Sequence, residues 1–571
     1  MKNNEVNTLT TPYEAKMTRE LPLSDYPRPS MVRNSYISLN GEWEFAVSDD
    51  GEDFDYSDKI LVPFPPESRL SGYNKKIPRD KVMHYRRIFS LDSDFINDRV
   101  ILHIDASDCI SDVYVNNNFC AHNEGGYLPF SADITDFIRD GENEICIDVS
   151  DSLSQVFPYG KQKEKRGGMW YTPTSGIWQS VWLESVPEEY IHSLRITQCM
   201  KYAEIEIIGI DRPKTLTLSD GSVYNFSDDK IRITPKEIHL WSPEDPYLYT
   251  FTLRCGEDEV KGYFALREIA TRMVNGQKRL TLNGKPYLFN GLLDQGYFPD
   301  GLFMPATYDG FLEDILYAKS LGFNTLRKHI KIEPEIFYHL CDKYGMIVFQ
   351  DMVNNSDYSF IRDTALPTVG MKRFPDSLLH RNKRSRAIFE EHMIKTVERL
   401  YNFPSVLYYT IFNEGWGQFR ADDMYRIAKD TDSTRIYDAT SGWFWQKLSD
   451  VDSHHVYFKP IKLKKKTSKK PVVISEFGGY SYRIPGHLFG EDNYGYRLFK
   501  TREEFEEAFI HLYDKEVREA IQNGASGFIY TQVSDIEDET NGVMTYDRQV
   551  KKLDPQRILP LMKDLSSIVQ F

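Results

Sequence analysis

The chain has little cysteine, no long apolar run and no excess of basic residues. Its 571 residues include six cysteines, and none of them form a Cys-x-x-Cys pair. The cysteines are scattered along the chain, and in a reducing compartment we expect free thiols rather than disulfides or zinc ligands.

Membrane, secretory and nucleic-acid signals are also missing. No segment approaches the roughly 18 apolar residues of a membrane span, and the opening MKNNEVNTLTTPYEAK has no apolar core of a secretory signal. We therefore expect a cytoplasmic protein with no membrane partner. The formal net charge of -15 argues against a nucleic-acid partner, because that affinity comes mainly from basic side chains. The one basic run, residues 461–470, is predicted to be a solvated surface loop rather than an anionic-ligand patch.

The first part of the chain reads as β-structure in two blocks. Residues 1–185 contain short runs of alternating apolar and polar residues separated by turn residues, such as GEWEFAV, RVILHIDA, EICIDVS and SVWLESV. No long segment with the 3.6-residue period of a helix interrupts them, so we predict a jelly-roll β-sandwich. Residues 186–270 continue this pattern in a smaller block, which suits an immunoglobulin-like β-sandwich.

Residues 271–571 have a different pattern of apolar and polar residues. Asn283-Gly284 marks a two-residue hairpin, after which helical patterns alternate with short buried strands. The strand candidates are YLFNGLL, FNTLRKH, MIVFQDM, VLYYTIFNE, RIYDATSGW, VDSHHVYF, PVVISEF and GFIYTQVSD. Eight strands separated mostly by helices predict a catalytic (β/α)8 barrel, also called a TIM barrel.

Two of these strands end on a glutamate. Glu414 follows the fourth strand in LYYTIFNEGWGQF, and Glu476 ends the seventh in PVVISEFGG. In such barrels catalysis occupies the C-terminal ends of the strands. Glycoside hydrolysis needs two carboxyl groups there, one to donate a proton and one to attack the anomeric carbon or activate water. The structural alternative is that each glutamate pairs with an arginine or caps a helix.

Glycines and aromatic residues lie around both glutamates. Gly415, Gly417, Gly478 and Gly479 are predicted to let the backbone approach a ligand closely. Tryptophans offer flat surfaces on which sugar rings stack, and packing in the barrel core is the alternative for each of them. The candidates are Trp416, Trp443 and Trp445.

Other side chains near the predicted strand ends are candidates for substrate binding. We expect the phenol of Tyr457 to hold the nucleophile or the ring oxygen, with simple packing as the alternative. The candidates for binding sugar hydroxyls are Asp294, Arg327, His329, Asp351 and His455. For each of them a structural ion pair or hydrogen bond is the alternative. No nucleotide-binding, zinc-protease or serine-hydrolase motif occurs at a supporting position, and we expect no cofactor.

With those residues located, the sequence resembles glycoside hydrolase family 2, which contains β-galactosidases, β-glucuronidases and β-mannosidases. LNGEWEF, GGYLPFSADIT and YTPTSGIWQSVWLE resemble its N-terminal jelly roll, and LNGKPYLFNG resembles its entry into the barrel. FNEGWG and ISEFGG resemble its acid/base and nucleophile motifs. The resemblance implies that Glu414 is the general acid/base and Glu476 the nucleophile, with retention through a covalent glycosyl-enzyme. It also implies that Asn413 binds the sugar 2-hydroxyl and that Tyr457 lies near the nucleophile.

Several positions depart from the family pattern. Family β-glucuronidases read the sugar carboxylate with an Asn-x-Lys pair, whereas this chain has Glu539 and Asn541, and a glutamate would repel a uronic acid. Met352 replaces a metal-ligating glutamate of the magnesium-dependent β-galactosidases, so we expect no metal. The second barrel strand reads NTLRKHIKIEP in place of the commoner family sequence around His329, and Tyr530 replaces a common tryptophan.

The sequence therefore predicts a metal-independent, retaining exo-β-glycosidase that acts on terminal non-reducing sugars of oligosaccharides or glycosides. The first choice of sugar is β-galactose, and the alternatives are α-L-arabinopyranosidase, β-glucuronidase and β-mannosidase activity. A non-catalytic carbohydrate-binding protein and an endo-acting hydrolase are the rival functions. The resemblance further implies that the jelly roll walls one side of the pocket and that a homo-oligomer is among the expected states.

Overall fold

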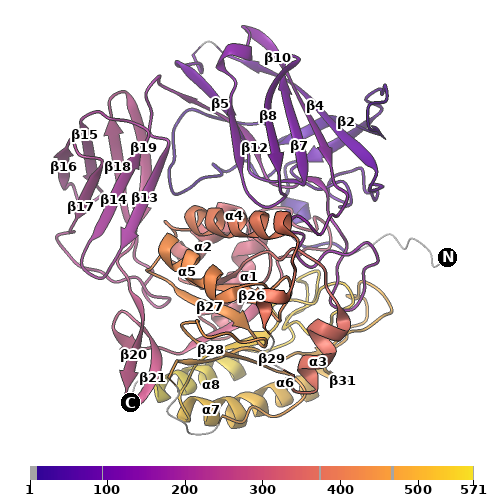
Figure 1. Ribbon diagram of the computed structural model, residues 1–571, viewed down its shortest axis with the longest axis vertical. Coiled ribbons are helices and arrows are strands. Elements are labelled where there is room, and N and C mark those ends of the chain that lie inside the picture. The colour runs from indigo at the N-terminus through magenta and orange to yellow at the C-terminus, as the bar shows by residue number, and fades with distance from the viewer. Residues whose placement is uncertain (1–8, 93, 372–374, 464–468, 570–571) are drawn as a thin grey trace.

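The computed structural model describes residues 9–92, 94–371, 375–463 and 469–569. Figure 1 shows two β-sandwiches lying above a barrel that is surrounded by helices. The centre of the predicted lysine loop, 464–468, and the first residues, 1–8, lie outside the described residues. Within the described ranges, none of the helices has the length and apolarity needed to cross a membrane. All six cysteines are free thiols.

The first sandwich consists of two main antiparallel sheets. Its larger sheet has the order β3-β2-β4-β10-β7-β8, and its smaller sheet has the order β1-β12-β5-β9. Alternate residues of β10 (Gly141–Ser150) are buried, because neighbouring side chains of a strand point to opposite faces. The other strands are β1 (Tyr36–Ser38), β2 (Gly41–Asp49), β3 (Asp58–Val62), β4 (Lys81–Leu91), β5 (Arg99–Ile104), β7 (Ile110–Val115), β8 (Asn118–Glu124), β9 (Phe130–Asp133) and β12 (Val181–Val186), with β6 (Ser107–Asp108) and β11 (Gly176–Ile177) forming a short separate pair.

A smaller sandwich follows. It packs a three-stranded sheet, β13-β14-β17, against a four-stranded sheet, β16-β15-β18-β19. The strands are β13 (Ser193–Gln198), β14 (Ala203–Ile208), β15 (Lys214–Leu218), β16 (Val223–Phe226), β17 (Lys230–Ile233), β18 (Tyr249–Cys255) and β19 (Asp258–Phe264). The chain then enters the barrel through β20 (Ile269–Val274), β21 (Gln277–Leu282) and β22 (Lys285–Pro286). Asn283 and Gly284 both have positive φ between β21 and β22, as the predicted hairpin requires.

The barrel contains all eight predicted strands, and every pairing in it is parallel. The order is β27-β26-β25-β24-β23-β32-β29-β28. The strands are β23 (Phe289–Asp294), β24 (Thr325–Lys328), β25 (Ile347–Asp351), β26 (Val406–Asn413), β27 (Ile436–Ser441), β28 (Asp452–Val456), β29 (Val472–Gly478) and β32 (Ala525–Thr531). The fold predicted from the sequence is therefore confirmed.

Helices follow most of these strands. They are α1 (Asp309–Ser320), α2 (Glu335–Tyr344), α3 (Leu366–Thr368), α4 (Lys383–Arg399), α5 (Ala421–Thr431), α6 (Arg502–His511), α7 (Arg518–Gln522) and α8 (Pro555–Ile568). A π-helical segment, Leu512–Val517, joins α6 to α7, and the short strands β30 (Tyr480–Tyr482) and β31 (Arg497–Phe499) pair beside the barrel. Short turns of other helix types lie at Glu14–Lys16, Thr135–Phe137, Ile361–Ala365 and Asp376–Leu378.

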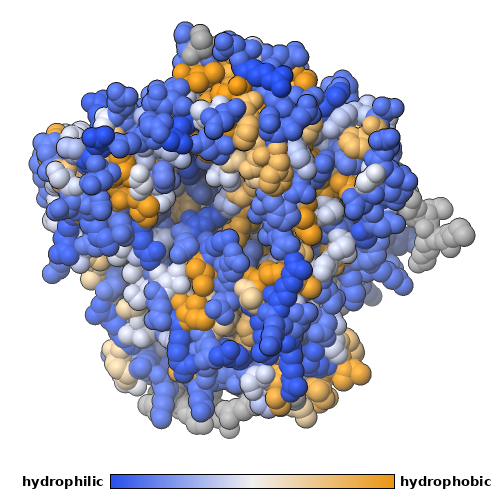
Figure 2. Space-filling view, turned by 45° about the horizontal axis from the view of Figure 1, so that its top comes forward, coloured by the Kyte–Doolittle hydropathy of each residue, from blue (hydrophilic) through white to orange (hydrophobic). Residues whose placement is uncertain are grey.

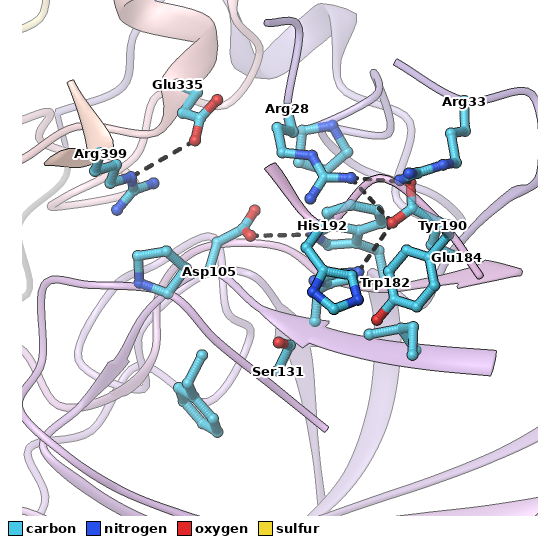
Figure 3. A pocket seen from close by; sticks show the side chains of 15 residues that line it. Arg28, Arg33, Asp105, Ser131, Trp182, Glu184, Tyr190, His192, Glu335 and Arg399 are labelled. Atoms are coloured by element: carbon cyan, nitrogen blue, oxygen red, sulfur yellow. Dashed lines mark hydrogen bonds and ion pairs between the residues drawn. The ribbon is translucent and has the colours of Figure 1, made fainter. Parts of the chain in front are cut away.

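A polar pocket of about 390 Å³ lies where the three domains meet (Figure 3). The space-filling view shows the molecule hollowed between the two sandwiches (Figure 2). Arg33 bridges Glu184 of β12, at 2.9 Å, and Asp258 of β19, at 2.7 Å. Burial alone would raise the pKa of Glu184, but Arg28, His103 and Arg33 hold it well below its usual value. These buried ion pairs join the first sandwich to the second.

We expect Glu184→Gln to destabilise the folded protein, because it leaves the buried Arg33 and the partly buried Arg28 without their shared partner. Breaking one side of a buried ion pair costs about 3–5 kcal/mol of unfolding free energy. The measurement is urea unfolding at pH 7. As a control, the exposed Glu142→Gln on β10 should change the unfolding free energy by less than about 0.5 kcal/mol.

The pH dependence of this difference has a definite sign. Because the folded pKa of Glu184 is depressed, its stabilising charge is fully present above the unfolded pKa of about 4.3 and is lost as the pH falls through the folded value. The gap between wild type and Glu184→Gln should therefore be constant near neutrality and shrink in acid. A gap that grew as the pH fell would contradict this assignment.

Candidate active site

Two glutamates meet at the C-terminal end of the barrel. Glu414 directly follows β26 with a φ of +52°, and its backbone N–H donates to the Ser441 carbonyl of β27 at 2.9 Å. Glu476 lies near the end of β29. The strand order places β26 and β29 next to β27 and β28, the two strands where the sheet closes on itself. This closure brings the two glutamates to the same mouth.

His455 of β28 lies between them. Its Nδ1 atom is 2.8 Å from Glu414 Oε1 and 3.5 Å from Glu476 Oε2. Its Nε2 atom lies 2.9 Å from the Ser441 hydroxyl, which links β28 to β27. One carboxyl oxygen of each glutamate and one ring nitrogen of His455 all lie within 4.8 Å of one another. The mouth therefore holds two carboxyl groups with oxygens within 4.8 Å of each other.

The surroundings push the pKa values of the two carboxyl groups apart. Burial alone would raise the pKa of Glu476, but His455, Arg327 and His329 lower it to about 2. Burial raises the pKa of Glu414, and the negative charge of Glu476 adds to that rise, although His455 opposes it. Near neutrality the site therefore favours an ionised Glu476 next to a Glu414 that retains its proton more readily.

Arg327 of β24 lies at the base of the site and binds residues of other barrel strands. This fully buried guanidinium donates to Glu476 Oε1 at 3.1 Å, to Asp351 Oδ1 at 2.9 Å and to Asn413 Oδ1 at 2.9 Å. It also donates to the Ser475 carbonyl at 2.9 Å. Because the Asn413 oxygen is occupied in this way, its Nδ2 group is the side that can donate to a ligand.

Tyr457 contacts the other oxygen of Glu476. Its hydroxyl donates to Glu476 Oε2 at 2.5 Å and lies 2.9 Å from the Thr531 hydroxyl. The ring stacks on Tyr496 with centroids 3.9 Å apart. Glu476 is therefore held on both sides, by Arg327 and by Tyr457, and its carboxylate has a fixed orientation.

Two further predicted polar residues have different surroundings. His329 Nδ1 lies 2.7 Å from Asp351, and burial, followed by the charge of Lys161, lowers the pKa of His329 to about 4. This histidine is therefore neutral near pH 7. Asp294 instead forms an ion pair with Lys328 at 2.7 Å and accepts from the Gly296 backbone. This ion pair is the structural alternative that the sequence offered for Asp294, and substrate binding by Asp294 stays a prediction.

The tryptophans also differ from one another. Trp416 is only 2% exposed and stacks on Trp170 of the first sandwich, with centroids 5.2 Å apart. The expected open platform for a sugar is therefore wrong for Trp416, whose face is covered by protein. Trp443 is half-buried and stands edge-on to His455 at 5.7 Å. Trp445 packs against His454 and donates to the Ser453 carbonyl.

Two of the glycines beside the glutamates lie against aromatic rings of the protein. A Cβ atom at Gly415 would lie 2.2 Å from the Phe444 ring, and one at Gly478 would lie 2.2 Å from the Tyr530 ring. Both glycines also have positive φ. Contacts within the protein therefore already require glycine at these two positions.

The first sandwich walls one side of the mouth, as the resemblance implied. Its loop at residues 157–175 docks on the barrel through Tyr159, whose N–H donates to the Asn354 carbonyl at 3.1 Å. The Tyr171 hydroxyl donates to Glu539 at 2.7 Å. Sequence reasoning missed Lys161 and Trp170 of this loop, because they lie in or beside a charged run that is typical of solvated surface.

Among the described residues of the barrel, the group with a spacing that could hold a cation is Glu414, His455 and Glu476. Met352, where the resemblance places a metal-ligating glutamate, is buried in the barrel core and offers no oxygen ligand.

Family comparisons agree with this geometry. Residues 273–554 match the model described as "Glycosyl hydrolases family 2, TIM barrel domain". Residues 73–187 match the sugar binding domain of the same family, and residues 202–267 match a third family 2 model. The chain belongs to glycosyl hydrolase family 2.

The curated relatives of this chain are named as β-galactosidases. A β-galactosidase of Clostridium acetobutylicum is 23% identical over 447 residues, which are 69% of this chain and 47% of the relative. A β-galactosidase of Priestia megaterium is 22% identical over 564 residues, which are 86% of this chain and 52% of the relative. The chain thus spans about half the length of these curated relatives.

Solved structures of similar fold are named for acidic sugars. A β-D-glucuronidase of Dictyoglomus thermophilum has a TM-score of 0.75 at 19% identity, over 96% of this chain and 99% of the other. A family 2 β-galacturonidase of Eisenbergiella tayi, bound to galacturonate, has a TM-score of 0.69 at 18% identity, over 95% and 99% of the two chains. At these identities the likeness establishes the shared fold alone.

Proposed function

We propose that this family 2 protein is a retaining exo-β-glycosidase. The observation that carries the proposal is the pair of carboxyl groups, Glu414 and Glu476, whose oxygens lie within 4.8 Å and whose pKa values are shifted in opposite directions. Retaining glycosidases hold their carboxyl groups about 5–5.5 Å apart, whereas inverting enzymes need a gap of about 6.5–9.5 Å to admit a water. The short separation supports retention.

The reaction would proceed in two displacements. In the first, Glu476 attacks the anomeric carbon, the bond to the leaving oxygen breaks, and Glu414 transfers its proton to that oxygen. In the second, Glu414 takes a proton from water, whose oxygen attacks the anomeric carbon and releases Glu476. Each step inverts the anomeric centre, so the product retains the starting configuration. Arg327 and Tyr457 would steady the Glu476 carboxylate as it leaves.

The finer assignments remain proposals. β-Galactose is our first choice of terminal sugar, in agreement with the names of the curated relatives. The alternatives are α-L-arabinopyranoside, β-glucuronide and β-mannoside. A purely carbohydrate-binding protein would have no need for two carboxyl groups with opposed pKa shifts. We also propose a cytoplasmic location, a metal-independent reaction and assembly as a homo-oligomer.

Rates on nitrophenyl glycosides test this proposal. The panel contains β-galactose, β-glucuronate, β-mannose, β-glucose, β-xylose and α-L-arabinopyranose. We expect Glu476→Ala to abolish turnover of the preferred substrate, because no nucleophile remains, and added azide to restore a product of inverted configuration. An azide product of retained configuration would remove Glu476 from the nucleophile role.

Glu414→Ala tests the proton donor. We expect a loss of about 1,000-fold or more on substrates with poor leaving groups and a much smaller loss on activated aryl glycosides, since only the former need protonation. The measurement is kcat/KM across a series of aryl glycosides with different leaving-group pKa values. Equal losses across the series would contradict the acid role of Glu414.

Arg327→Gln tests the charge that keeps Glu476 ionised. Activity requires an ionised Glu476, so the acid limb of the kcat/KM profile reports its pKa, which lies at about 2 in the intact site. Removing the guanidinium raises this pKa, and we expect the acid limb to move to higher pH. The exposed Arg426→Gln serves as control and should leave the limb in place. An unmoved limb in Arg327→Gln would exclude this electrostatic role.

A further inference from the structure

The loop from the first sandwich carries one cation into the mouth. At Gly160, which has a φ of +66°, a Cβ atom would lie 2.9 Å from the Tyr127 hydroxyl and 3.1 Å from the Ile330 carbonyl. Only glycine allows the chain to pass this closely over the end of β24. The next residue, Lys161, is fixed by its own carbonyl, which accepts from the Tyr171 N–H at 3.0 Å.

The side chain of Lys161 is buried among groups of the site. The residue is 9% exposed, and its Nζ lies 5.6 Å from the Tyr171 ring centroid and 5.7 Å from that of Trp416. Burial dominates the pKa of Glu539, of Glu414 and of His329, and the charge of Lys161 acts on all three. The ammonium therefore lies near Trp416 of the acid/base loop and near Tyr171, whose hydroxyl donates to Glu539.

This ammonium has no polar partner in the part of the chain that the structure describes. No hydrogen-bond acceptor lies within 3.5 Å of it, and no carboxylate oxygen lies within 4.0 Å. An ammonium has three N–H donors, and here the protein leaves all three available to a ligand. Lys161 is thus a donor that the protein itself does not satisfy.

Glu539 is held rigidly across from it. Its carboxylate accepts from the Tyr171 hydroxyl at 2.7 Å, from Gln532 Nε2 at 3.1 Å and from Asn541 Nδ2 at 3.2 Å. A carboxylate has about four acceptor positions, so one remains. An unused donor and an unused acceptor therefore both lie beside Tyr171, and they form no ion pair with each other.

We propose that Lys161 is a specificity-determining residue whose ammonium, together with Glu539, binds a hydroxyl group of a neutral terminal sugar. A hydroxyl accepts one hydrogen bond and donates another, so it satisfies the ammonium and the carboxylate at once. The inference rests on the proposed glycosidase function and assigns the sugar-reading contact to a residue of the N-terminal sandwich.

Charge selects a hydroxyl over a sugar carboxylate. Lys161 and Glu539 have opposite charges, so the two form a neutral unit. A uronic acid would bring a second carboxylate against Glu539, and Glu476 already acts unfavourably on the charged form of Glu539. Like charges in a site of low dielectric repel strongly. We therefore expect this chain to reject the acidic sugars for which its structural neighbours are named.

The test compares Lys161→Met with wild type on nitrophenyl β-galactoside and β-glucuronide. The exposed Lys165→Met, on the same loop, is the matched control. We expect wild type to favour the neutral sugar by at least about 100-fold in kcat/KM, and Lys161→Met to lose about 30- to 100-fold on it, since a hydrogen bond to a charged group is lost. Lys165→Met should stay within about twofold. Wild-type preference for the uronide, or an Lys161→Met rate within threefold of wild type, would overturn the inference.

Monodeoxy substrates distinguish a direct contact between Lys161 and the sugar from a purely structural role of Lys161. Removing the hydroxyl that Lys161 binds, at the 3, 4 or 6 position, should slow wild type strongly but cause no further loss in Lys161→Met. A merely structural lysine would give equal losses in both proteins at every position, which would also overturn the inference. Lys161→Gln, which keeps a polar side chain, replaces Lys161→Met if the latter fails to fold.

Direct binding distinguishes failure of this inference from failure of the proposed function. Calorimetric titration with free galactose requires no turnover. A protein that cleaves no glycoside but binds galactose about 30-fold more weakly as Lys161→Met would refute the enzyme and keep the role of Lys161. Equal dissociation constants for wild type and Lys161→Met would refute that role whether or not the enzyme turns over.

Discussion

The buried guanidinium of Arg327 is the interaction on which the site depends. A fully buried arginine requires compensating charge, and here it joins Glu476, Asp351 and Asn413 from three different strands. The same contacts that satisfy the arginine orient the proposed nucleophile and the amide beside the acid. Stability of the barrel floor and geometry of the reacting groups are thus consequences of one network.

The mouth is a joint construction of two domains. The barrel supplies the carboxyl groups, while the first sandwich supplies the Trp170 ring that stacks on Trp416 and the Lys161 ammonium 5.7 Å from the same Trp416 ring. Buried ion pairs around Arg33 tie the first sandwich to the second, and contacts such as Tyr159 to Asn354 tie it to the barrel. The position of the wall therefore depends on charges and hydrogen bonds far from the reacting atoms.

The sequence predicted the parts of this arrangement that have local signals. Apolar strands ending in Glu414 and Glu476 have a short, readable pattern, and the strand count led to the barrel. Contacts between distant segments had no such signal. The sequence left both roles of Trp416 and Asp294 open, because the stacking partner Trp170 lies in another domain and the ion pair of Asp294 with Lys328 depends on strand register. Lys161 lay hidden in a charged run that resembles surface.

The stacking of Trp170 on Trp416 has a consequence for how the protein matures. Trp416 lies two residues after Glu414 and stacks on Trp170. The loop that carries Glu414 therefore packs against a segment of the first sandwich that is synthesised long before it. Glu539 follows the last barrel strand, β32, and is therefore made after both reacting carboxyl groups. A growing chain therefore carries one wall of the pocket throughout the synthesis of the barrel, and its mouth closes only when the last strand arrives. Hydrolytic competence would then appear abruptly, at the end of assembly, rather than in stages.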